Sequence, residues 1–142
     1  MTAKQYLTKV DMLDRMIKNK LSEIYQLKTM ACSITVSNDG DRVQKSSDKD
    51  RLGSSVVKIV DLERETDDLV DEFVDRRQKI IKQIDEMAAV NLDYYDILSM
   101  RYVGKRTFDD IAKNTGWSIR KVFSMHGKAL KEFEIMFEKE FS

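Results

Sequence analysis

The first thirty residues carry an apolar repeat of seven. Apolar side chains recur at every seventh position, and a second set lies three residues after the first, interrupted by Lys20. The first set is Ala3, Val10, Ile17, Ile24 and Ala31, and the second is Tyr6, Leu13 and Leu27. This spacing places one apolar stripe along a helix and is typical of coiled coils. We predict a helix from Ala3 to about Ala31.

A second long helix is predicted after a break in this pattern. Residues 33–55 are rich in Ser, Asp, Asn and Gly and show no sustained periodicity, which favours a long mobile loop. The seven-residue repeat then returns at Ile59, Thr66, Phe73, Ile80 and Met87. We predict a helix from Val56 to about Ala89, roughly 50 Å long at 1.5 Å per residue. Two such helices predict an antiparallel, coiled-coil-like hairpin over residues 1–90, a domain for oligomerisation or interaction.

Residues 91–142 change to a pattern of shorter helices and form a second predicted domain. Gly104 suits the C-terminal cap of the first short helix. Thr107 suits the N-cap of the second, with Asp109 and Asp110 placed favourably for the helix dipole. The three expected helices span about 92–103, 107–114 and 118–139. Because the chain also lacks proline, the whole pattern predicts an all-α fold.

The stretch between the last two helices has the residues that a helix-turn-helix requires. Such a motif holds two short helices at a steep angle across a tight turn. Ala112 is small enough to let the second helix approach, and Gly116 can adopt the left-handed backbone of the turn. Ser118 can cap the following helix. The side chains expected to fill the angle or the core beneath it are Ile111, Trp117, Val122 and Met125.

The second helix of this motif, about 118–130, is predicted to be a recognition helix in the major groove of DNA. Arg120 can donate two hydrogen bonds to guanine O6 and N7, and Ser124 can reach a base or a phosphate. The lysines and Arg106 suit phosphates, which position a protein without specifying sequence. The ten predicted DNA-contacting residues are Ser118, Ile119, Arg120, Lys121, Phe123, Ser124 and Lys128 on this helix, and Lys105, Arg106 and Lys113 before it.

Charge is distributed unevenly along the 142 residues. The formal net charge is zero, but residues 101–131 hold eight Lys/Arg against two Asp/Glu, and the rest of the chain is correspondingly acidic. This asymmetry predicts one basic face on an otherwise acidic molecule, as nucleic-acid binding requires. Charged residues make up 35% of the chain, above the roughly one quarter of an average domain, which indicates much exposed helix surface.

The sequence gives no case for an enzyme, a cofactor or a metal site. A single cysteine, Cys32, allows no intramolecular disulfide and no Cys-rich metal site, and His126 is the only histidine. No nucleophile–base pair or phosphate-binding loop is present. No apolar run approaches the roughly 20 residues that span a membrane, and the N-terminus has no signal-peptide pattern. We therefore expect a cytoplasmic protein in a reducing compartment.

Three features of the last helix receive structural interpretations. Gly127 costs about 1 kcal/mol relative to alanine inside a helix, and close packing against a neighbouring helix is the favoured explanation. His126 is interpreted as a polar helix residue near the DNA or the helix bundle. Phe133, Phe137 and Phe141 form a stripe that predicts a seam within the chain or between oligomer subunits.

The C-terminal residues resemble region 4 of bacterial sigma factors. That region contains an L-x-x-R-Y/F segment, a Gly, an E/D-I-A triplet, a second Gly, S-x-x-x-V and A-L. The matching residues are Leu98, Arg101, Tyr102, Gly104, Asp110, Ile111, Ala112, Gly116, Ser118, Val122, Ala129 and Leu130. The whole chain is similar to small phage and prophage proteins of Gram-positive bacteria, described as transcriptional regulators near the RinA and ArpU late-gene activators. A complete sigma factor also needs regions that grip the polymerase core and melt the promoter, so we do not expect one here.

Three functions remain open at this point. The first is a phage-type transcriptional regulator that binds double-stranded DNA, acts as a homodimer or higher oligomer, and has RNA polymerase as an additional candidate partner. The second is a small terminase-like subunit for DNA packaging, since such subunits also join a helix-turn-helix to helical oligomerisation segments. The third is a protein-interaction module that docks on polymerase or a regulator without contacting DNA.

Overall fold

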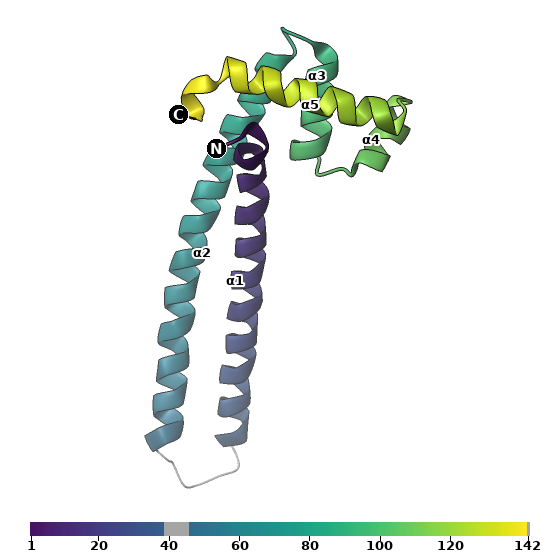
Figure 1. Cartoon of the computed structure of the whole chain (residues 1–142). Helices are drawn as coiled ribbons and strands as arrows, with labels where there is room; N and C mark the ends of the chain where they lie inside the picture. The colour runs from purple at the N-terminus through teal and green to yellow at the C-terminus, as the bar shows by residue number, and fades with distance from the viewer. Residues whose placement is uncertain (39–45, 142) are drawn as a thin grey trace. The chain divides into compact units, whose positions relative to one another are not determined.

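The computed structural model describes residues 1–38 and 46–141, and it is all-helical over these residues, with no strand (Figure 1). This confirms the predicted fold class at the level of secondary structure. The elements are α1 (Ala3–Asn38), α2 (Ser46–Met87), α3 (Leu92–Leu98), a π-helical turn η1 (Ser99–Val103), α4 (Phe108–Thr115), α5 (Ile119–Met136) and a 3-10 turn η2 (Glu138–Glu140). None of the described helices is both long enough and apolar enough to cross a membrane.

The loop predicted over 33–55 is wrong at both of its ends. α1 continues to Asn38 and α2 begins at Ser46, so that 33–38 and 46–55 are helical, whereas 39–45 lie outside the described residues. Ser, Asn and Asp each destabilise a helix by less than about 1 kcal/mol relative to alanine, which is too little to end a helix by itself. Leu52, one repeat before Ile59, is half-buried and extends the apolar stripe of α2 upstream.

The chain divides into two compact units, 1–11 with 74–142 and 12–73. The boundary therefore falls inside α1 and α2, whereas the predicted boundary lay between residues 90 and 91. The C-terminal helices share their unit with the first residues of α1 and the last residues of α2.

In the unit of residues 12–73, α1 and α2 run antiparallel (Figure 1). Among the side chains that the structure describes, ion pairs join them from Lys20 Nζ to Glu65 Oε2 at 3.3 Å and from Lys28 Nζ to Glu63 Oε1 at 3.2 Å. The predicted repeats form the apolar seam between the helices. Leu13, Ile17 and Ile24 of α1 are buried, while Ile59, Leu62, Leu69 and Phe73 of α2 are half-buried.

Two polar residues interrupt this seam. Lys20 takes the repeat position of Leu13 and Leu27, and Thr66 takes that of Ile59 and Phe73. Thr66 is only 4% exposed, and its hydroxyl donates to the carbonyl of Leu62 at 2.7 Å. A polar residue at one seam position costs stability but selects the register, because other alignments would bury it against apolar side chains.

The unit of residues 1–11 and 74–142 contains a fully buried core. Its largest members are Leu7, Ile84, Met87, Ile97, Leu98, Ile111, Val122 and Phe133. Tyr6 donates its hydroxyl to Gln83 Oε1 at 2.8 Å, and its ring centroid lies 5.2 Å from that of Phe141 and 6.1 Å from that of Phe133. The aromatic stripe near the C-terminus is thus a seam within the chain, one of the two alternatives that the sequence left open.

Candidate nucleic-acid interface

α4 begins at a capped N-terminus. Thr107 is the N-cap, and its Oγ1 accepts the backbone N–H of Asp110 at 3.2 Å. Asp109 and Asp110 lie in the first turn, where their charge interacts favourably with the helix dipole. Before it, Gly104 ends η1, as predicted, and a Cβ there would lie only 2.9 Å from the carbonyl oxygen of Met100. The chain therefore enters α4 along a tightly constrained path.

The turn between α4 and α5 has the geometry expected from the sequence. Gly116 adopts φ 74° and ψ 9°, and its N–H donates to the carbonyl of Ala112 at 2.9 Å. Thr115 Oγ1 donates to the carbonyl of Ile111 at 2.7 Å and accepts the N–H of Trp117 at 3.2 Å. The Oγ of Ser118, the N-cap of α5, accepts the N–H of Lys121 at 3.2 Å. These bonds hold the backbone of the turn in place.

The inward face of the two helices is apolar. Ile111 and Val122 are fully buried, and Ala112, Trp117 and Met125 are half-buried. α5 packs against both α3 and α4. The residues that the sequence assigned to the interior therefore lie there, which fixes the opposite face of α5 toward solvent.

All ten predicted DNA-contacting residues are exposed. On α5, two of them are large apolar side chains, Ile119 and Phe123. The first turn of α5 contains Arg120 and Lys121 and no acidic residue. The helix dipole places a partial positive charge at this N-terminus and therefore disfavours the two cations. A phosphate that bound there would be attracted both by the dipole and by the side-chain charges.

Some of these cations have partners within the protein. Lys121 Nζ lies 4.8 Å from the centroid of the Trp117 ring, a cation–π distance. Lys105 Nζ lies 3.7 Å from Asp11 Oδ1, and Lys105 itself adopts a left-handed backbone with φ 53°. Asp11 would therefore compete with a phosphate for Lys105.

The interpretation of Gly127 as a packing glycine is wrong. Gly127 is exposed, and a Cβ built on it would meet no atom within 4 Å. It lies on the solvent side of α5, because the buried positions Val122 and Ala129 point toward the core. Helical periodicity placed it on α5 but could not reveal whether a neighbouring element covers that face.

A polar and aromatic cluster lies behind the exposed face of α5, and sequence reasoning did not identify it. The hydroxyl of Tyr102 and Nε2 of His126 are 2.7 Å apart. The ring of Phe108 lies 5.0 Å from those of both His126 and Phe123. Arg101 places its guanidinium 4.1 Å from the centroid of Phe108 and donates to the carbonyl of Arg106 at 3.0 Å. The cluster thus connects η1, α4 and α5.

Tyr102 and His126 are both neutral at physiological pH. Burial, with smaller contributions from the charges of Arg101 and Lys4, lowers the pKa of His126 to about 4. Burial raises the pKa of Tyr102 to about 12. Because Tyr102 and His126 are 24 residues apart, no local spacing in the sequence signals their contact.

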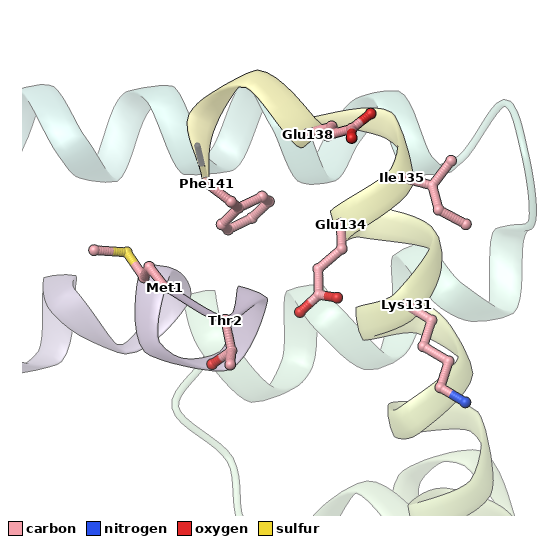
Figure 2. Close-up of a pocket in the computed structure, with 7 residues that line it drawn as sticks. All are labelled: Met1, Thr2, Lys131, Glu134, Ile135, Glu138 and Phe141. Carbon is pink, nitrogen blue, oxygen red and sulfur yellow. The ribbon is translucent and has the colours of Figure 1, made fainter.

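An open cavity of about 600 Å³ lies further along α5 (Figure 2). Its lining residues are Met1, Thr2, Lys131, Glu134, Ile135, Glu138 and Phe141. Glu134 is engaged there, because its Oε1 accepts the N–H of Ala3 at 2.9 Å. None of the ten predicted DNA-contacting residues lines this cavity. Among the residues that the structure describes, no group of three or more His, Cys, Asp or Glu side chains could hold a metal ion.

Comparison of the chain with models of protein families, with curated proteins and with solved structures gave no match.

Proposed function

We propose that this chain is a sequence-specific DNA-binding transcriptional regulator of the phage and prophage type. In this proposal α4 and α5 are the two helices of a helix-turn-helix similar to sigma region 4. The first half of α5 enters the major groove, where Arg120 and Ser124 read base edges. Lys105, Arg106, Lys113, Lys121 and Lys128 contact phosphates.

One observation carries the proposal. The left-handed turn at Gly116 and the cap at Ser118 start α5 with its basic, acid-free first turn exposed to solvent. The protein therefore presents a positive helix N-terminus together with Arg120 and Lys121 on one surface, a combination that attracts a phosphate backbone.

The experiment measures fluorescence anisotropy of DNA fragments tiled across the gene neighbourhood of this protein, at two salt concentrations. We expect one fragment to bind far more tightly than the others, and Arg120→Ala to remove that preference, at a cost of about 1–3 kcal/mol. Arg64→Ala is the matched control, because Arg64 is an exposed arginine on α2. Equal binding of all fragments, or an Arg120→Ala protein that retains the preference, contradicts the recognition-helix assignment.

The exposed apolar residues of the same face favour a second candidate, docking on another protein such as RNA polymerase. Ile119 and Phe123 are 42% and 54% exposed, and the Phe108 ring anchors Phe123 from one side. On DNA, these side chains suit thymine methyl groups. Phosphate contacts weaken steeply with salt, whereas apolar protein contacts do not. Salt-insensitive binding to polymerase in the absence of DNA would therefore support docking in place of DNA reading.

A further inference from the structure

In the unit of residues 12–73, one side of the α1–α2 pair carries exposed apolar residues on both helices. We call this side the apolar face and define it by Leu21 and Tyr25 of α1 and Val56, Val60 and Val70 of α2. Their exposed fractions include 53% for Leu21, 72% for Tyr25 and 38% for Val70. Exposed apolar residues are ordinary when scattered, so their position on one side is what matters.

The Lys28–Glu63 ion pair identifies that side. Leu21 lies one seven-residue repeat before Lys28, and Val70 lies one repeat after Glu63. Because the helices are antiparallel, one repeat backward along α1 and one repeat forward along α2 lead in the same direction in space. Leu21 and Val70 therefore lie at the same height along the helix pair, on the side that carries the ion pair. Tyr25 and Val60 lie three residues before Lys28 and Glu63, on the outer flank of the same side.

The opposite side of α2 is charged. It carries Lys58, Glu65 and Glu72 at successive repeat positions, all exposed. On α1, the successive repeat positions on that side are Met16, Glu23 and Met30. The exposed valines of α2 therefore do not reflect a generally apolar helix surface, because they lie away from this charged side.

The seam beneath the apolar face is incompletely covered. Leu52, Ile59, Leu62, Leu69 and Phe73 of α2 are only half-buried between the two helices. Two helices alone cannot enclose such a stripe, and a four-helix bundle is the usual arrangement that does. Further helices over the apolar face would remove both Leu21 and the flank of the seam from water.

We propose that a second copy of this chain covers the apolar face with its own apolar face, forming an antiparallel four-helix bundle. The charges on this side select a second copy as the occupant. α2 contributes the acids Glu63 and Asp67 there, whereas the net positive charge of α1 comes from Lys28, because Asp14, one repeat before Leu21, pairs with Lys18 at 3.1 Å. A twofold axis along the helices sets each α1 against the α2 of the other copy, and opposite charges then meet.

The other twofold arrangement is unfavourable. It would set α2 against α2 and bring the four acidic side chains of Glu63 and Asp67 from the two copies together. The face is thus complementary to itself in one orientation only. The inference concerns residues 12–73 and does not depend on DNA reading by α5.

The test is sedimentation of the full chain without DNA, over concentrations from about 1 to 100 µM, since dimers form by mass action. We expect a mass of two chains at the upper end. Leu21→Glu and Val70→Glu should each raise the dissociation constant at least about tenfold, because each buries a charge in the bundle. Met30→Glu is the control, since Met30 is 58% exposed on the opposite side. Far-UV circular dichroism checks that helicity is unchanged.

A charge exchange tests the orientation. Lys28→Glu should weaken the dimer, and the double variant Lys28→Glu/Glu63→Lys should restore it, because the exchange preserves opposite charges within and between copies. A wild-type chain that stays monomeric throughout, a ring of more than two copies, or apolar-face variants that associate as tightly as Met30→Glu would each overturn the proposal. A monomer would leave the face to a different protein.

Discussion

The hydroxyl of Tyr102 lies 2.7 Å from Nε2 of His126, and this bond joins η1 to the middle of α5. Both groups are half-buried, and this partial burial favours the neutral form of each. The pair lies behind the exposed face of α5, next to the ring of Phe108 that supports Phe123. Protonation of His126 would place a charge in this cluster beside Arg101.

The free energy of unfolding should therefore decrease as the pH is lowered, because of His126. The pKa of His126 is lowered from 6.5 to about 4, so between these values the unfolded chain binds the proton more readily than the folded one. The contribution of neutral His126 is complete above pH 6.5 and is lost as pH falls toward 4. Urea unfolding at pH 7 and pH 5 should show a smaller loss in His126→Gln than in the wild type. Equal losses in the two proteins would contradict this prediction.

Gly127 and Gly116 should respond oppositely to alanine. Neither would bring a Cβ within 4 Å of another atom, so the two sites differ in backbone conformation and not in space. Gly127→Ala should raise the unfolding free energy by about 1 kcal/mol through helix propensity. Gly116→Ala should lower it by about 1–2 kcal/mol, because φ 74° is unfavourable for a residue with a Cβ. Chemical denaturation measures both, and a destabilised Gly127→Ala protein would restore the packing interpretation.

Asp11 should restrain DNA binding through Lys105. Their ion pair is 3.7 Å long and exposed, and such pairs contribute at most about 1 kcal/mol. If Lys105 contacts a phosphate, Asp11→Asn should tighten DNA binding by up to about fivefold and Lys105→Ala should weaken it, in anisotropy titrations at low salt. Asp109→Asn is the comparison for a general loss of negative charge, because Asp109 belongs to the first turn of α4. The same gain in both variants would show a general charge effect.

Lys20 should reduce the stability of the α1–α2 seam while fixing its register. Its side chain is 32% exposed and reaches Glu65 from a seam position that is otherwise apolar. Lys20→Leu should raise the unfolding free energy by about 1 kcal/mol. Asn19→Leu is the control, because Asn19 is exposed and lies outside both the seam and the apolar face. A Lys20→Leu protein with a lower unfolding free energy than the wild type would show that the Lys20–Glu65 ion pair stabilises the protein more than a buried leucine does.

Helices, caps and the turn could be predicted from the sequence because each depends on neighbouring residues. The Oγ1 of Thr107 bonds three residues ahead, the Oγ of Ser118 does the same, and the left-handed turn needs only the missing Cβ of Gly116. The error over 33–55 had the same local origin. Polar residues dominate this segment, but Leu52 continues the seven-residue repeat into it.

Sequence periodicity also divided α5 correctly into a buried face and an exposed face, since both follow from the helical repeat. Whether the exposed residues contact DNA remains a prediction. The repeat did not show that Gly127 faces open solvent, nor that Lys105 lies beside Asp11.

The sequence alone therefore determined the helical fold, the caps of α4 and α5, and the left-handed turn between them. Only the tertiary structure decided that Tyr102 meets His126, that the unit boundary falls inside α1 and α2, and which side of the α1–α2 pair carries exposed apolar residues on both helices. The physical reason is the distance along the sequence between the residues that form each feature. Caps and turns are formed by bonds across a few residues, whereas burial, shifted pKa values and uncovered faces depend on which distant segments the core brings together.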